Sequence, residues 1–322
     1  MSGTNSTNDN LPSSGFLIAM SIFASLCIIV GVIGNIGVIT YNIFMNYSKT
    51  PTTCFVVNLA IADIIVCFTL FPSGLFEFIS ILMDKDSDRS LICKVIVTSS
   101  STSLALSIAV ILAITVDKCI FISKPLKYPM IMTWTKTYIL IAAIFAVALI
   151  NASLIFAYTD NTGNTRLSCA IGNSTVENIF YIPNIFLPSL GLCYFNYRIY
   201  KVAKNQRRKI RIASCSSQTH GNQNAEAEET AKKPQEERRE MLRQIRVVKT
   251  FAIIIGVYFV CLFPKIITSR LRSRGVPISR SVSVATGMLV GLNSVVNPFV
   301  YGIRNKEYRI AYRQFFSRFL RG

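Results

Sequence analysis

The chain has 322 residues, of which 51% are hydrophobic and only 16% are charged, and its mean hydropathy is +0.45. An ordinary soluble enzyme carries about 25% charged residues, so this composition excludes that class. Seven apolar stretches follow one another, each long enough for the ~20 residues that cross a bilayer as a helix. In chain order they are residues 15–43, 54–82, 91–120, 138–158, 178–197, 250–269 and 281–303. The sequence predicts an all-α membrane protein, a bundle of seven transmembrane helices within residues 15–303.

The basic residues predict the orientation, because lysine and arginine gather on the cytoplasmic side of membrane proteins. Residues 1–14 contain neither, and we expect them to form an extracellular N-terminus. The inner segments then hold 25 of the 34 lysine and arginine residues; these segments are 44–53, 118–136, 198–249 and 304–322. Most of the residues behind the formal charge of +18 are therefore expected on the cytoplasmic side, where they face anionic lipid and protein, and they do not indicate nucleic-acid binding.

Two features are expected on the outer side. The sequons at Asn5 and Asn173 are predicted glycosylation sites. Cys93 and Cys169 are the two cysteines placed on the oxidising side, where a disulfide between them would hold the loop after the fourth span over the bundle. The alternative is two free thiols.

The carboxylate of Asp63 lies near the middle of the second span, where a charge is costly and marks a functional site by default. Amide and hydroxyl groups of other spans could hydrate this acid, keep it neutral, or bind a small cation together with it. These candidates are Asn35, Ser107, Asn293, Ser294 and Asn297. The alternative is a polar plug that only locks the helices together.

A second charge within the spans is Lys265, directly after Pro264 in the sixth span. A buried ammonium needs an anion, which a ligand could supply. The alternatives are an internal ion pair with Glu77 and a side chain that extends to the rim. The third span is rich in hydroxyl groups over residues 98–103, although such groups often bond to their own helix.

On the inner side, residues 205–235 are polar and predict a long third cytoplasmic loop. Residues 304–322 place aromatic side chains on one face and arginines off it. This pattern predicts an amphipathic helix on the inner membrane surface, followed by a short tail.

The sequence does not indicate an enzyme. The single histidine, His220, lies in the polar loop, and the chain has no glycine-rich phosphate loop. An ion transporter is an alternative, because Asp63 and Lys265 could mark an ion path, although the sequence has no internal repeat.

Several motifs occur together and in a fixed order. They are Asn35; Asn58-Leu59-Ala60-Ile61-Ala62-Asp63; Cys93 with Cys169; "DKCIFISKPLKY" at 117–128; Pro264; and Asn297-Pro298-Phe299-Val300-Tyr301. In these motifs the chain resembles the rhodopsin-like (class A) family of G protein-coupled receptors, over all seven spans and the C-terminal helix. The resemblance implies a multi-pass receptor of the plasma membrane with an extracellular ligand, a heterotrimeric G protein and arrestin as partners.

The resemblance also implies roles for the polar residues of the spans. It predicts a sodium pocket, with an allosteric sodium ion as the one expected cofactor, formed by Asp63, Ser107, Asn293, Ser294 and Asn297. It predicts that Asp117 and Lys118 restrain the inactive state and contact the G protein. It further implies that Pro264 and Pro298 lie in the switching helices and that Tyr301 moves on activation.

The chain departs from the family pattern at two positions of that switch. Lys118 stands where the family usually has arginine, and Leu262 stands where it usually has tryptophan. Lysine keeps the charge but lacks the planar fork of five donors. A receptor-like protein that does not signal is therefore an alternative.

Two further positions bear on the ligand. Ser100 stands where amine receptors carry aspartate, so a biogenic amine receptor is not expected, and Gly291 stands where opsins carry the retinal-binding lysine, so an opsin is excluded. Following the family geometry, Lys265 should face the ligand cavity, with Ser100 and Leu262 also in the pocket. We expect the ligand to be an anionic small molecule or an acidic peptide.

Overall fold

The computed structural model describes residues 12–46, 49–83, 90–160, 170–171, 179–217, 252–272, 274, 276–304, 308–310, 313–314 and 317. Seven of the described helices are long and apolar enough to cross a membrane. They are Ser14–Met45, Pro51–Leu82, Lys94–Ser123, Trp134–Tyr158, Ile179–Val202, Ala252–Arg272 and Arg280–Ile303. The predicted seven-helix membrane fold is confirmed.

The elements have the following bounds. In chain order they are α1 (Ser14–Thr40), η1 (Tyr41–Met45), α2 (Pro51–Leu82), α3 (Ser90–Ser123), η2 (Pro125–Lys127), α4 (Tyr128–Ile131), α5 (Trp134–Tyr158), β1 (Thr159–Asp160), β2 (Ala170–Ile171), η3 (Ile182–Phe186), α7 (Leu187–Ser217) and α9 (Arg280–Arg304). We call the helix Ala252–Arg272, between α7 and α9, the sixth spanning helix. The strands β1 and β2 pair antiparallel, with Thr159 opposite Ile171. The sequence did not predict this pair, because two-residue strands are too short to show an alternating pattern.

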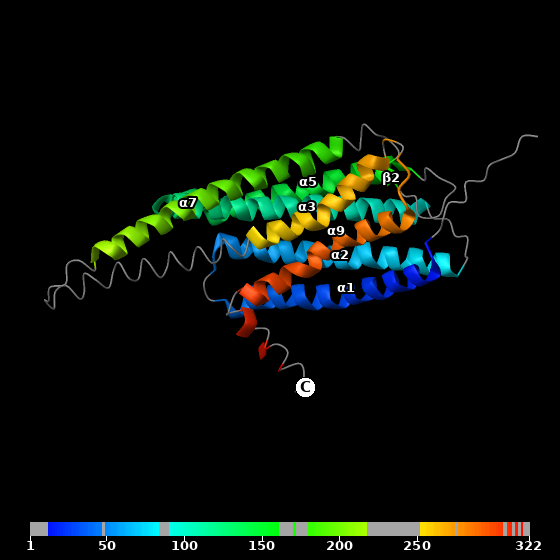
Figure 1. Ribbon diagram of the computed structural model, residues 1–322, viewed down its shortest axis with the longest axis horizontal. Helices are drawn as coiled ribbons and strands as arrows, with labels where there is room; N and C mark the ends of the chain where they lie inside the picture. The colour runs from blue at the N-terminus through cyan, green and yellow to red at the C-terminus, as the bar shows by residue number, and fades with distance from the viewer. Residues whose placement is uncertain are drawn as a thin grey trace, which may run out of the picture.

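The helices lie side by side in an elongated bundle (Figure 1). α3 is central and packs against α2, α5 and α7, while α1 packs against α2 and α9. α1 begins at one end of the bundle and α9 ends at the other (Figure 1). We call these ends the N-terminal end and the C-terminal end.

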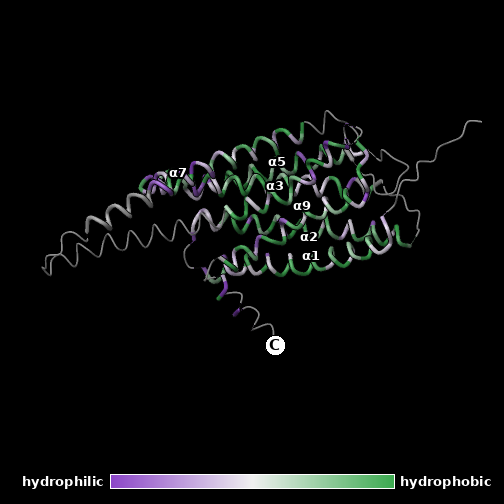
Figure 2. Tube along the Cα trace, in the orientation of Figure 1, coloured by the Kyte–Doolittle hydropathy of each residue, from purple (hydrophilic) through white to green (hydrophobic). Residues whose placement is uncertain are grey.

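The interior is packed with large apolar side chains, and the largest fully buried one is Tyr258 of the sixth spanning helix, with 1% of its surface exposed. Hydrophobic residues continue along the whole length of the spans (Figure 2), and many of them are exposed on the outside of the bundle. Leu149 and Val260, for example, are 69% and 71% exposed. Apolar residues on both the inside and the outside of a helix bundle are expected when lipid is the solvent.

One predicted boundary was wrong. α7 continues to Ser217, so residues 205–217 are helical where the sequence predicted a loop. This stretch contains no glycine or proline, and its first half has three arginines, one lysine and one glutamine, which favour helix even though they are polar. The rest of the predicted loop, 218–235, lies outside the described residues. The described residues 308–310, 313–314 and 317 are helical, in agreement with the predicted C-terminal helix.

Three predictions for the outer side fall outside the described part of the chain. Asn5, Asn173 and Cys169 are not described, and Cys93 lies near the start of α3 in a segment whose side chain is not described. Glycosylation and the Cys93–Cys169 disulfide therefore stay predictions.

Candidate functional site

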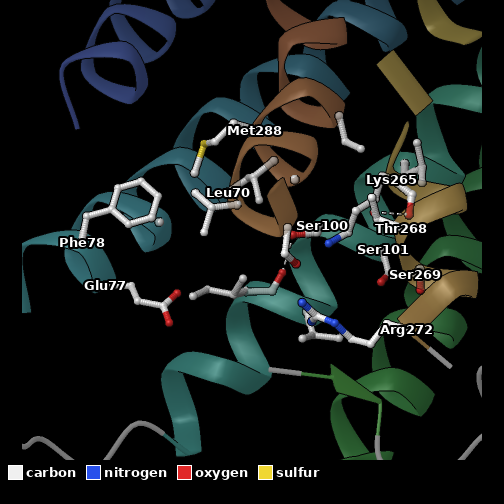
Figure 3. A pocket seen from close by; sticks show the side chains of 18 of the residues that line it. Leu70, Glu77, Phe78, Ser100, Ser101, Lys265, Thr268, Ser269, Arg272 and Met288 are labelled. Atoms are coloured by element: carbon white, nitrogen blue, oxygen red, sulfur yellow. Dashed lines mark hydrogen bonds between the residues drawn. The ribbon is translucent and has the colours of Figure 1, made fainter. Parts of the chain in front are cut away.

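A cavity of about 400 Å³, seen from close by in Figure 3, is lined by the last turns of α2 and the first turns of α3 and α9, toward the N-terminal end of the bundle. α2, α3, the sixth spanning helix and α9 surround it, and Tyr181 adds a ring from the segment before η3. Its volume falls in the range of roughly 300–1,000 Å³ that small-molecule sites occupy. The cavity is therefore large enough for a small ligand.

The two sides of the cavity differ in chemistry. α3 and the sixth spanning helix contribute its polar side, which consists of Ser100, Ser101, Lys265, Thr268, Ser269 and Arg272. α2 and α9 contribute a mostly apolar side, with Leu70, Gly74, Phe78, Val284, Gly287 and Met288. Glu77 is the one carboxylate among the described residues of the lining, and Figure 3 shows it across the cavity from Arg272.

The amine of Lys265 is directed into this cavity on the side of Ser100 (Figure 3). Among the described residues, no carboxylate oxygen lies within 4.0 Å of Lys265 Nζ, so the ion pair with Glu77 that we considered is not formed. A Cβ atom added to Gly287 would lie 4.0 Å from Nζ and would approach no other atom that closely. Lys265 is thus a half-buried cation next to open space.

The other predicted pocket residues behave differently. Ser100 lines the cavity, but its hydroxyl donates to the carbonyl of Ile96 at 2.6 Å, within its own helix. Leu262 is not among the residues that line this cavity, and its assignment to the ligand pocket stays a prediction. Leu262 lies about one helical turn from Lys265, toward the C-terminal end of the bundle, and is only 2% exposed because it packs into the main apolar core.

Below the cavity, the predicted polar residues come together. Asn297 Nδ2 donates to Asp63 Oδ2 at 2.8 Å, and Asn35 Nδ2 donates to the carbonyls of Gly31 and Ser294, both at 2.9 Å. The contacts follow from the packing of α1, α2 and α9 against one another. This network joins α9 to α1 and α2, which lie more than 200 residues earlier in the chain.

Two oxygen atoms of this region have no hydrogen-bond partner among the described residues: Oδ1 of Asp63 and Oδ1 of Asn293. Ser107, Asn293 and Ser294 line a second, much smaller cavity of about 10 Å³, which shares Ser100 with the larger one. Carboxylate, amide and hydroxyl oxygens are ligands for small hard cations.

At the C-terminal end of the bundle, the fully buried Asp117 is surrounded by donors. Lys118 Nζ lies 3.5 Å from Asp117 Oδ2, and the Tyr128 hydroxyl donates to Oδ1 at 2.7 Å. Thr52 donates to Oδ2 and accepts a hydrogen bond from Lys118. Lys118 is also placed over the ring of Phe121, 5.5 Å from its centroid. Thus Asp117 and Lys118 form one polar cluster with α2 and α4.

Aromatic rings connect the end of α9 and the residue Tyr308 that follows it to η1. The ring of Tyr308 stacks on Tyr301, with centroids 5.5 Å apart, and lies 4.1 Å from the ring of Tyr41. Asn42 Nδ2 donates to the Tyr308 hydroxyl at 2.7 Å. Pro298 lies within α9, and a Cβ on Gly34 of α1 would come within 3.0 Å of its ring. The close approach of the helices at the proline therefore favours glycine at position 34.

Residues 34–301 match the family model described as "7 transmembrane receptor (rhodopsin family)". The chain belongs to this receptor family. The rhodopsin-family chain is 26% identical to the histamine H2 receptor of Homo sapiens over 320 residues, which cover 95% of this chain and 81% of that receptor. It is 26% identical to the adenosine receptor A2b of Homo sapiens over 300 residues, covering 85% and 82%. The crystal structure of squid rhodopsin has the same fold, with a TM-score of 0.76 at 19% identity and coverage of 97% and 88%.

As a rhodopsin-family member, the chain is a membrane receptor that signals through G proteins, and its family consists of receptors and not of enzymes. The resemblance based on motifs is confirmed at this level. A relative named for histamine, however, conflicts with our expectation that the chain is not a biogenic amine receptor.

The sequence did not reveal every residue of these clusters in the receptor. Thr52, Tyr128, Asn42 and Tyr308 were not singled out for the contacts they make, because ordinary polar residues at helix ends carry no special pattern. Gly287 was also missed, since its contribution is the absence of a side chain.

Proposed function

We propose that this receptor binds its extracellular ligand through a negatively charged group, carried by an anionic small molecule or an acidic peptide. The observation that carries the proposal is the Lys265 amine, which is directed into the cavity with no carboxylate in salt-bridge range among the described residues. A desolvated ammonium without a counter-ion is costly, so an anion that pairs with it gains this free energy on binding. Arg272 supplies a second positive charge to the same cavity.

An amine ligand is the second candidate, and the similarity to the histamine H2 receptor favours it. An ammonium group would need a carboxylate, and Glu77 is the one that the described lining offers. Against this candidate stands Ser100, a neutral hydroxyl that bonds to its own helix where amine receptors are expected to carry aspartate.

Thermal unfolding of the purified receptor in detergent tests both candidates, with panels of organic anions and amines. A ligand at about 100 times its dissociation constant stabilises the folded state by roughly 2.7 kcal/mol. Anions should stabilise the wild type but not Lys265→Gln, and they should still stabilise Lys94→Gln. Lys94 is a matched control, because its amine lies over the ring of Phe156, 5.6 Å from the centroid, and it does not line the cavity. Stabilisation by amines that is lost in Glu77→Gln would favour the second candidate.

An opsin remains excluded in this proposal. A Cβ on Gly291 would come within 2.8 Å of both Leu70 and Phe71, so the backbone at this position has no room for a lysine side chain. This crowding supports the interpretation of Gly291 from the sequence.

Signal transmission is proposed to pass through the cluster of Asp117, Lys118, Thr52 and Tyr128, which would hold the inactive state, and through Pro264, Pro298 and Tyr301. The ammonium of Lys118 cannot bind one carboxylate through two parallel hydrogen bonds, as the planar guanidinium of an arginine can. Guanine-nucleotide exchange on a purified G protein separates a working receptor from one that does not signal.

A sodium ion fits the network around Asp63. The unpartnered oxygens of Asp63 and Asn293, together with the hydroxyls of Ser107 and Ser294, are of the kind that hold a small cation. A cation there would supply a fixed positive charge that lets Asp63 stay ionised within the membrane.

The remaining proposals concern the surroundings of the receptor. The N-terminus is proposed to be extracellular and the C-terminus cytoplasmic, because basic residues gather on the second side. Arrestin and anionic membrane lipids are proposed partners of that basic side, and the plasma membrane is the proposed location. Glycosylation at Asn5 that is lost in Asn5→Gln would support this orientation.

A further inference from the structure

We propose that the ligand of the cavity is a monoanion with an apolar body, held with its charge between Lys265 and Arg272 and its apolar part against Leu70, Phe78 and Met288. This inference rests on the anion binding proposed above and assigns the ligand's chemical class and its direction in the cavity.

The direction follows from the charges of the two sides. Lys265 and Arg272 belong to the sixth spanning helix, and Glu77 lies across the cavity on α2 (Figure 3). An anion close to Lys265 is attracted by two cations, whereas a second negative group at the far side would lie against the apolar side chains of α2 and α9 and lose its hydration. The cavity therefore selects against a ligand with negative charges at both ends.

The apolar body follows from the walls formed by α2 and α9. Phe78, Leu70 and Met288 are 1%, 6% and 7% exposed, so each is fixed by its packing. The Met288 methyl lies so close to Gly74 that a Cβ there would come within 2.6 Å of it. A firmly packed apolar wall binds an apolar group by removing its surface from water, without first having to be ordered.

Gly287 determines whether the amine can be reached. A Cβ at this position would lie 4.0 Å from Lys265 Nζ, which is ordinary van der Waals contact, and would meet nothing closer. A methyl group added here would therefore cause no clash in the receptor, but it would occupy the space in front of the ammonium. We assign Gly287 as a residue that sets the size of the anionic group accepted.

Four probes separate charge from apolar surface on the wild-type receptor in detergent, with dissociation constants measured by calorimetry and thermal unfolding. They are propanoate, 3-phenylpropanoate, 3-phenylpropanamide and 3-(4-carboxyphenyl)propanoate. The phenyl ring should tighten binding about tenfold or more over propanoate, as burial of a phenyl-sized group does. The neutral amide and the dianion should each bind at least about tenfold more weakly than 3-phenylpropanoate.

Three variants with matched controls place the parts of the ligand. Lys265→Gln should abolish the advantage of 3-phenylpropanoate over its amide, whereas Lys94→Gln should keep it. Met288→Asn should reduce the affinity ratio of 3-phenylpropanoate to propanoate, whereas Met130→Asn, at an exposed residue of α4, should leave this ratio as in the wild type. Gly287→Ala should weaken all carboxylates, whereas Gly256→Ala, where a Cβ meets nothing within 4 Å, should not.

The outcomes distinguish the two proposals. If carboxylate binding does not depend on Lys265, the anion site itself is wrong, and this inference falls with it. If binding depends on Lys265 but the ring adds less than about twofold, or the dianion binds as tightly as the monoanion, the anion site stands and the amphiphilic class is overturned. The ligand series on the wild type decides this even if a variant fails to fold.

Discussion

The hydroxyl of Tyr128 donates a hydrogen bond of 2.7 Å to Oδ1 of Asp117, a carboxylate that is fully buried at the C-terminal end of the bundle. Tyr128 belongs to the short helix α4, and Asp117 belongs to α3. Thr52 of α2 holds the other oxygen of the same carboxylate. One acid thus ties two neighbouring elements to the central helix, at the end where we expect the G protein to bind.

Removing the Tyr128 hydroxyl should loosen this end. Tyr128→Phe leaves one carboxylate oxygen with fewer donors, and we expect a loss of about 1–3 kcal/mol in the free energy of unfolding, because hydrogen bonds to charged groups are among the stronger ones. Basal nucleotide exchange should rise. Tyr138→Phe is the control, because Tyr138 is 57% exposed and only stacks on Trp134. Equal stability of the two variants would contradict the role given to Tyr128.

The effect of Tyr128→Phe should not depend on pH in the ordinary range. Burial raises the pKa of the Tyr128 phenol above its usual value of about 10, and the Asp117 carboxylate raises it further. A group whose pKa is raised on folding contributes its full stability below the unfolded pKa and loses it only as pH rises through the folded pKa. The stability difference should therefore be constant from about pH 6 to about pH 9.

Thr52→Val should act through the same cluster. It removes the bond to Asp117 and the acceptor for Lys118, and we expect a loss of about 1–3 kcal/mol in stability. Because Thr52 and Tyr128 bind the same carboxylate, the losses of the double variant should not add. Thr69→Val is the control, since that hydroxyl bonds only to the carbonyl of Ile65 in its own helix. Strict additivity in chemical denaturation would show that the two contacts are independent.

Asp63→Asn tests the sodium site. If a cation is bound by Asp63, the melting temperature of the wild type should rise with sodium chloride more than with N-methylglucamine chloride of equal ionic strength. At a sodium concentration about 100 times the dissociation constant, the gain should be roughly 2.7 kcal/mol. In Asp63→Asn the two salts should act alike. A wild type that responds equally to both would rule out the ion.

Two glycines should respond in opposite directions to the same substitution. Gly291→Ala places a Cβ within 2.8 Å of Leu70 and Phe71, and we expect it to cost about 1–3 kcal/mol through overpacking. Gly256→Ala meets no atom within 4 Å and should stabilise its helix by about 0.5–1 kcal/mol. Thermal unfolding of the two variants side by side checks this, and a loss in both would show that helix packing at Gly256 was misjudged.

Much of the receptor's architecture could be predicted because the membrane constrains the length and the hydrophobicity of each span. Apolar runs must be near 20 residues long, so their ends were found within a few residues. Asp63 had to find polar partners in hydrocarbon, and few were available, which is why its contact with Asn297 could be anticipated. At the end of α7 the membrane imposes no such rule, and there the predicted loop was wrong.

The parts that escaped prediction depend on how helices are rotated against one another. Thr52 and Lys118 are 66 positions apart, and only the packing of α2 on α3 brings them together. Leu262 was assigned to the ligand pocket from its place in a motif, yet the lining of the cavity on this helix begins only at Lys265. The role of Gly287 could not be predicted, because a sequence shows which side chains are present and not where the fold leaves open space.

The buried phenol of Tyr258 raises the free energy of the helix arrangement seen in this structure. Its hydroxyl lies in the main core with no hydrogen-bond partner among the described residues. Such a group costs about 1–3 kcal/mol, which any other packing that offers it an acceptor would recover. That sum is comparable with the few kcal/mol that separate two conformers of one protein. If the signalling arrangement of the helices offers the Tyr258 hydroxyl an acceptor, a ligand needs to supply correspondingly less of the free energy of activation.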